Sequence, residues 1–161
     1  MANPQTYSKT QIGLHWAIAL LVFFQILFHD GIKQVWLDRM KGVVANEPSF
    51  NLHALIGLAI GILVIWRLWL RFTRGVPALP EKEHPALRML AALVHGLFYV
   101  FLLLMAASGI TAWFFGLSQP ALVHSIAEKA ILALIAVHVA GALVQHFVYR
   151  SDVLRRMLGL G

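Results

Sequence analysis

The sequence contains no cysteine among its 161 residues. This absence excludes disulfides, thiolate-bound iron–sulfur clusters and the covalent attachment of a c-type haem. Charged residues are also scarce, at 12%, whereas hydrophobic residues make up 60% of the chain. A soluble domain of ordinary composition carries about 25% charged residues and a smaller apolar share. The composition therefore predicts an integral membrane protein.

Signatures of several soluble functions are missing as well. The sequence has no glycine-rich phosphate loop and no convincing Ser/His/Asp pattern, so nothing in it supports nucleotide binding or hydrolysis. The formal net charge of +6 could indicate binding to nucleic acid. However, the basic residues lie at the ends of apolar segments. The positive-inside rule, by which Lys and Arg gather on the cytoplasmic side of a membrane, explains this placement. We therefore expect membrane lipid, and no nucleic acid, as the surroundings of this chain.

Four long apolar segments dominate the sequence, and each has about the 20 residues needed to span a bilayer. They cover residues of about 11–30, 52–72, 89–115 and 121–149. Breakers such as Gly, Pro and Asn separate them, and short connections favour antiparallel neighbours. We predict an all-α fold, an integral membrane four-helix up-down bundle, formed by a single transmembrane domain over residues 1–161.

The distribution of charge predicts how the bundle is oriented. One side of the four-span arrangement collects most of the basic residues: Lys9, Arg67, Arg71, Arg74, Lys82, Arg88, Arg150, Arg155 and Arg156. On the other side, Lys33, Arg39 and Lys41 are balanced by Asp30, Asp38 and Glu47. The positive-inside rule then predicts that both termini are cytoplasmic. Within the balanced link, "IKQVWLDRMKGV" is typical of a short amphipathic helix at the membrane surface.

Histidine is abundant for a membrane chain, with eight residues. His124 and His138 lie 14 residues apart in the last apolar segment. At about 1.5 Å and 100° per residue, this interval places them about 21 Å apart on nearly the same helix face. His53 should match the depth of His124 near the periplasmic side. His15 should match the depth of His138 toward the cytoplasm.

Neutral imidazoles that face a bundle interior suit haem iron, and two axial histidines form a six-coordinate centre suited to electron transfer. Four histidines at two matched depths thus predict two b-type haems. Structural zinc is a poorer fit because it requires four ligands at one point. Histidines that serve packing alone remain an alternative, as does close helix packing for the small-residue stretch "GLAIG". His29 and His84, beside chain breaks, are expected to face solvent.

At these residues the sequence resembles the prokaryotic cytochrome b561 family of di-haem, quinone-linked membrane cytochromes. The resemblance rests on "YSKTQIGLHW", "NLHALIGLAIGILVIWRLWLR", "LVHGLFYVFLLLMAASG" and "HSIAEKAILALIAVHVAGALVQH", in this order over nearly the whole chain. In that family, histidines of helices one, two and four ligate two haems b. The resemblance implies the same role for His15, His53, His124 and His138.

The resemblance also implies a function in the bacterial inner membrane. Members of the family oxidise superoxide on the periplasmic side and pass the electron through both haems to ubiquinone. Relatives in the wider superfamily are haem-carrying membrane anchors that transfer electrons for a partner dehydrogenase or hydrogenase. We expect a superoxide:ubiquinone oxidoreductase, with the anchor subunit as the alternative. A partner subunit is compatible with this expectation but not required.

Three further residues are candidates for the cytoplasmic half of the site. His95 and His146 could bind a quinone carbonyl or relay its proton, or each could bond only a backbone carbonyl or a haem propionate. His95 is also the rival of His15 as the cytoplasmic ligand, because their depths are similar. Arg67 could pair with a haem propionate or a quinone-site anion, whereas snorkelling to lipid phosphate is the alternative for arginines at this helix end.

Overall fold

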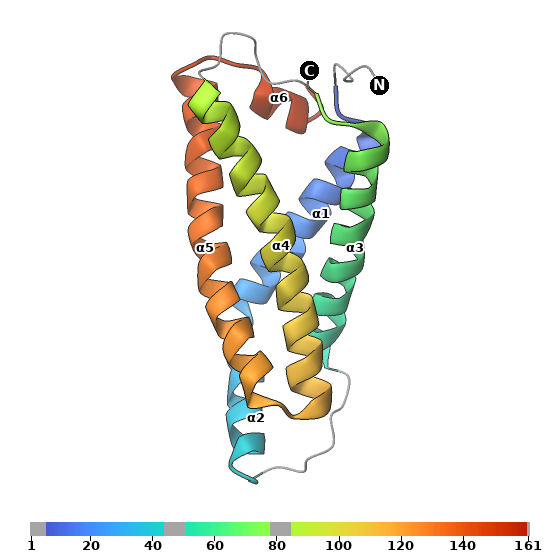
Figure 1. Cartoon of the computed structure of the whole chain (residues 1–161), viewed down its shortest axis with the longest axis vertical. Coiled ribbons are helices and arrows are strands. Elements are labelled where there is room, and N and C mark those ends of the chain that lie inside the picture. Colours follow the sequence, from blue (N-terminus) through green and yellow to red (C-terminus); the bar gives the residue numbers. More distant parts are fainter. Residues whose placement is uncertain (1–5, 44–50, 78–84, 161) are drawn as a thin grey trace.

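The computed structural model describes residues 6–43, 51–77 and 85–160. All regular secondary structure in these residues is helical (Figure 1). The helices are α1 (Lys9–Leu27), α2 (Asp30–Met40), α3 (Leu52–Arg74), α4 (Pro85–Phe115), α5 (Ser118–Phe147) and α6 (Val153–Met157). Of these, α1, α3, α4 and α5 are long and apolar enough to cross a membrane. The predicted fold class, a four-helix up-down membrane bundle, is confirmed.

The helix ends follow from local sequence. Ser8 and Gln11 form a capping box at the start of α1, and the Asn51 side chain accepts a hydrogen bond from the Ala54 amide at the start of α3. Both caps satisfy amide groups that have no partner inside the helix. Gly75 ends α3 with φ +72°, and Gly116 turns the chain from α4 into α5 with φ +66°. Glycine adopts these left-handed conformations without the steric cost of a Cβ.

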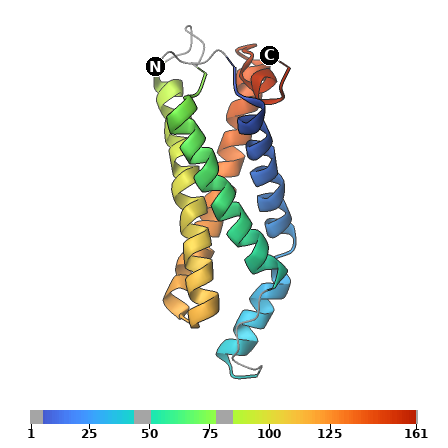
Figure 2. The same cartoon turned by 90° about the vertical axis from the view of Figure 1, so that its right-hand side faces the viewer.

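The bounds of the four long helices differ from the expected spans by a few residues, and the start of α4 differs most. Helix α4 begins at Pro85, earlier than the predicted start near residue 89, because proline is well tolerated at the first helical position. Helix α2 begins at Asp30, directly after the end of α1. It corresponds to the amphipathic helix expected in this link, and it extends past the end of the α4–α5 hairpin (Figures 1 and 2).

Helix α4 packs extensively against both α5 and α3, and α1 packs against α3. The approach of α3 to α4 is close at Gly61, where an added Cβ would lie 3.1 Å from the Cβ of Ala106. The buried core cluster contains Ile18, Ile60, Val64, Leu102 and Ile131. Because Ile131 is seven residues from both His124 and His138, this core lies between the two levels of histidine on α5.

Candidate functional site

The four predicted ligands meet in two pairs. The ring centroids of His53 on α3 and His124 on α5 lie 6.2 Å apart. Those of His15 on α1 and His138 on α5 lie 6.1 Å apart. An iron with an imidazole on each side and metal–nitrogen bonds of about 2 Å needs ring centres about 6 Å apart. Both pairs therefore have the spacing that fits a haem iron between them.

Helix α5 supplies one histidine to each pair. Its interval of 14 residues separates the two by about 21 Å along the helix axis. The buried core occupies the space between the two levels, so the pairs form separate sites within one bundle. The described residues hold no group of three or more His, Cys, Asp or Glu side chains able to bind a metal ion directly. The histidines at each level thus come together as a pair.

His124 has a well-defined hydrogen-bonding environment. Its Nδ1 lies 2.9 Å from the carbonyl oxygen of Met105 on α4 and 3.4 Å from the Ser108 hydroxyl. Donation of the Nδ1 hydrogen to the carbonyl leaves the lone pair of Nε2 free for a metal. Across the site, Gln25 on α1 donates a hydrogen bond of 2.9 Å to the carbonyl oxygen of His53. This bond joins α1 to the first turn of α3.

A cavity of about 590 Å³ adjoins the His53–His124 pair. Gly57, Ile60 and Leu102 are among the small and apolar residues of its inner wall, which suits a flat, largely apolar macrocycle. Polar residues of the lining include Asn51, His29, Lys33, Glu128 and Lys129. The cavity thus combines an apolar interior with charged residues contributed by α2 and α5.

His29, expected to face solvent from its place beside a chain break, is partly exposed and partly in contact with α5. Its side chain is only 35% exposed, and Nε2 lies 3.7 Å from a Glu128 carboxylate oxygen. Its Nδ1 donates to the carbonyl oxygen of Ile26 at 2.8 Å. The contact with α5 was not expected, and it arises because α2 begins shortly after α1 ends and the junction lies against α5. His84, the other histidine in that expectation, lies outside the described residues.

Helix α2 covers this end of the bundle through Arg39. The Arg39 side chain is buried, with 8% exposure, and donates a hydrogen bond to the carbonyl oxygen of Trp113 in the last turn of α4. Its guanidinium also lies 5.7 Å from the centre of the Trp113 ring, within cation–π range. The sequence alone does not indicate this contact, because Arg39 lies in a link in which basic and acidic residues balance.

At the other level, His138 has a second imidazole neighbour. The ring of His95 on α4 lies 5.1 Å from that of His138, with the two planes at 90°. Its Nδ1 donates to the carbonyl oxygen of Ala91, so Nε2 is the free nitrogen. His95 and His15 therefore both lie beside His138. The sequence identified both, and the 6.1 Å spacing of His15 fits shared ligation of one iron better.

The remaining candidates lie on α3 and α5. Arg67 donates a hydrogen bond to the backbone carbonyl of Gln11, and the buried Gln11 side chain in turn donates to the carbonyl of Gly75 at 2.9 Å. Arg67 thus ties α3 to the start of α1. The ring of His146 lies 4.8 Å from that of Phe147. Among the described residues, the buried Nδ1 of His146 has no hydrogen-bond partner.

A four-span bundle with paired histidines at two depths defines a class of protein, the membrane-embedded electron-transfer cytochromes. The chain belongs to the prokaryotic cytochrome b561 family, whose model, described as "Prokaryotic cytochrome b561", matches residues 6–160. Membership implies b-type haem and electron transfer in a bacterial membrane.

Individual relatives match over nearly their whole length. Cytochrome b562 of Cereibacter sphaeroides is 35% identical over 158 residues, with 98% of each chain covered. Cytochrome b561 homolog 1 of Escherichia coli is 28% identical over 176 residues, covering 94% of this chain and 96% of the relative. A probable superoxide oxidase of Yersinia pestis is 25% identical over 176 residues, covering 94% of this chain and 95% of the relative. The chain is similar to each of these proteins.

Proposed function

We propose that the chain is a di-haem oxidoreductase of the bacterial inner membrane that transfers single electrons from periplasmic superoxide to ubiquinone. The observation that carries this proposal is the pair of histidine sites at two levels of one helix, α5. His53 and His124 would hold one haem, and His15 and His138 the other. When bound, haem iron supplies reversible one-electron chemistry. The protein orients the ligands and excludes water between the two sites.

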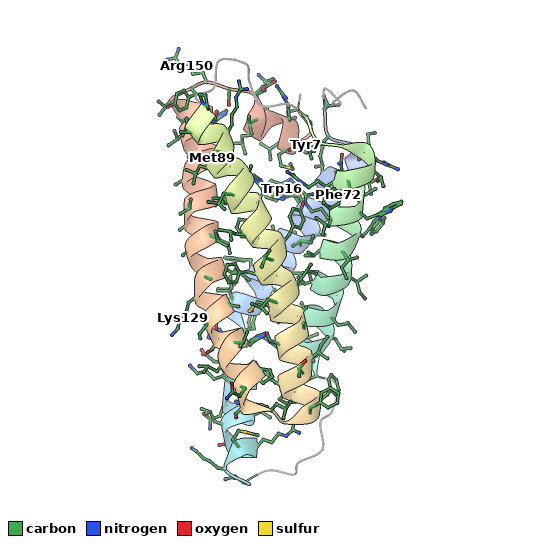
Figure 3. The ribbon with its side chains drawn as sticks, viewed as in Figure 1. Tyr7, Trp16, Phe72, Met89, Lys129 and Arg150 are labelled. Carbon is green, nitrogen blue, oxygen red and sulfur yellow. The ribbon has the colours of Figure 1, made fainter. Side chains whose placement is uncertain are left out.

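The charge distribution supports the proposed orientation. The basic ends of α3 and α5 and the arginines of α6 lie at the end of the bundle where α1 starts (Figures 1 and 3). Figure 3 places Arg150 and Tyr7 at that same end. By the positive-inside rule this end is cytoplasmic, and the His53–His124 cavity then lies toward the periplasm.

The cavity lining supports an anionic donor. Lys33 and Lys129 both line it, against a single carboxylate among the described residues of the lining, that of Glu128. Cationic side chains at a cleft raise the local concentration of a small anion and its rate of capture. The Yersinia pestis relative is named a probable superoxide oxidase, which agrees with this choice of donor.

Ubiquinone would accept the electron near the His15–His138 site. His95 presents a free Nε2 beside that site, and His146 carries a buried Nδ1 without a described partner. His146 could donate a hydrogen bond to a quinone carbonyl from Nδ1, whereas His95, whose Nδ1 hydrogen is bound to the Ala91 carbonyl, could donate and deliver a proton only after Nε2 has taken one up. Arg67, on α3 near the same end, could pair with an anionic group there.

Stopped-flow mixing of the purified protein with superoxide, with and without ubiquinone, tests this function. We expect superoxide to reduce the b-type bands and ubiquinone to reoxidise them. Lys33→Gln and Lys129→Gln should each slow the first phase by about threefold or more at low ionic strength, and high salt should reduce this difference. Gly13→Ala, at a position with open space around it, serves as the control.

Failure of superoxide to reduce the bands would overturn the proposed donor. A soluble dehydrogenase that co-purified in stoichiometric amount would then favour an anchor subunit that carries electrons for that partner.

A further inference from the structure

Helix α4 contributes no ligand to the proposed haem sites, yet it forms a close-fitting socket around His124. At Gly109, an added Cβ would lie 2.9 Å from Cε1 and 3.0 Å from Nδ1 of His124. Carbon atoms in good contact are about 3.5–4.0 Å apart, so any side chain here would displace the ring. The imidazole therefore packs directly against the backbone of α4.

Two polar groups of α4 complete the socket. They are the hydroxyl of Ser108, one residue before Gly109, and the carbonyl oxygen of Met105, about one turn before it. Ser108 is buried and donates its hydroxyl hydrogen to the carbonyl oxygen of Leu104 at 2.6 Å. Its oxygen is then free to accept, 3.4 Å from Nδ1 of His124, beside the 2.9 Å contact to the Met105 carbonyl. Two acceptors face Nδ1, and this arrangement fixes the hydrogen on that atom.

His53, the partner of His124 in the pair, has no such support from the described residues. Its Nδ1 is buried there without a hydrogen-bond partner. The two imidazoles of this site are thus held unequally. Because hydrogen bonding at Nδ1 raises the basicity of a metal-bound histidine, the environment of His124 should have the larger influence on the metal.

We propose that Gly109 and Ser108 are positioning residues, which fix the ring orientation and tautomer of His124 and thereby set the properties of the haem at the His53–His124 site. The inference rests on the proposed ligand set but not on the identity of the electron donor. It assigns to these two residues of α4 an influence on the His53–His124 site and none on the His15–His138 site.

The test combines redox titration with electron paramagnetic resonance of the haem-loaded protein. Gly109→Ala and Ser108→Ala should shift the midpoint potential and the low-spin signal of one haem and leave the other unchanged. Gly96→Ala, on the same helix but with no atom within 4 Å of the added Cβ, is the matched control and should change neither. Ser108→Thr keeps the hydroxyl and should restore the wild-type signals.

Wild-type potentials and signals in both Gly109→Ala and Ser108→Ala would overturn the inference. A parallel shift of both haems would also overturn it, because that result indicates a general loss of packing. Should Gly109→Ala fail to accumulate, the two Ser108 variants decide the question alone. If the wild-type protein lacks two bis-imidazole signals, the proposed ligand set itself is contradicted. If superoxide does not reduce the haems, only the proposed donor is contradicted, and the inference about Gly109 and Ser108 still stands or falls with the titration.

Discussion

His138 has two imidazole neighbours rather than one, and this crowding is the main feature of the His15–His138 site at the scale of single residues. The His15 ring lies 6.1 Å away and the His95 ring 5.1 Å away. Only the first distance leaves room for an iron with a metal–nitrogen bond of about 2 Å on each side. His95 is then free to contact a quinone or the edge of the haem.

Replacement of His138 by Ala should remove one of the two proposed haems and leave the other in place, because the sites share no ligand. His15→Ala should do the same, whereas His95→Ala should retain both haems. The haem content per chain from reduced-minus-oxidised spectra measures this. Loss of a haem in His95→Ala with retention in His15→Ala would reverse the assignment of the cytoplasmic ligand.

The sequence could predict the four paired histidines because helix geometry places His124 and His138 on one face, and the depths of His53 and His15 in their own spans match them. It could not predict the socket at Gly109 and Ser108. Their contact with His124 depends on how closely α4 approaches α5, and no periodic pattern encodes that distance. The same limit applies to His29, whose surroundings are determined by the direct junction of α1 and α2.

At the scale of elements, α2 is attached to the bundle by one buried side chain. Apolar runs in the sequence revealed the four spans because each has about the number of residues, or more, that a helix needs to cross the hydrocarbon core. The docking of α2 was not visible, since Arg39 looks like any other charge of a polar link. Its hydrogen bond to the Trp113 carbonyl instead closes the end of α4, where backbone acceptors have no partner within the helix.

Arg39→Ala should release α2 from the α4–α5 turn. Removal of a hydrogen bond from a charged donor to a buried acceptor costs about 1.5–3 kcal/mol, which is enough to open a short helix locally. Hydrogen exchange of residues 30–43 should therefore become faster by at least about tenfold. Lys41→Ala, at an exposed position of the same segment, should leave the exchange unchanged. Equal exchange in both variants would show that Arg39 does not hold α2.

Helix α6 carries an ion pair that should respond to acid. Arg156 Nε donates to Asp152 Oδ2 at 2.8 Å, and a second nitrogen of Arg156 lies 2.7 Å from Oδ1. This hydrogen bonding lowers the pKa of the Asp152 carboxyl. The pair therefore stabilises α6 above the ordinary Asp pKa, and this stabilisation is lost as the pH falls through the lowered pKa.

Asp152→Asn should remove that pH dependence from α6. The effect is small, about 0.5 kcal/mol, because the pair is exposed to solvent. Hydrogen exchange of the α6 amides, compared between about pH 6 and pH 3 after correction for intrinsic rates, measures it. We expect protection to fall with acid in the wild type and to stay flat in Asp152→Asn. A parallel fall in both proteins would assign the acid response to another group.

At the scale of the whole molecule, the two ends of the bundle differ in charge and in structure. One end combines the start of α1 with the basic helix α6, and the other carries α2 and the cavity beside His53 and His124 (Figure 1). This asymmetry gives the proposed electron path a direction. The sides from which the proposed donor and acceptor reach the protein therefore depend on how the bundle is oriented in the membrane.

A reporter fused after residue 161 tests this orientation. With a cytoplasmic C-terminus, a fluorescent protein at this position should be bright and alkaline phosphatase should be inactive. Reporters inserted after Gly42, at the opposite end, should show the reverse pattern. The same pattern at both positions would contradict the four-span topology. A reversed pattern would place the His53–His124 cavity on the cytoplasmic side.

The separation of His124 and His138 along α5 has a consequence for energetics. Their spacing of about 21 Å is about 70% of a hydrocarbon core of about 30 Å. One elementary charge that crosses the whole membrane exchanges about 2.3 kcal/mol per 100 mV with the membrane potential. An electron that moves inward over this interval works against an inside-negative potential by about 1.6 kcal/mol per 100 mV. In an energised cell the proposed reaction is therefore voltage-dependent, and collapse of the potential makes it more favourable.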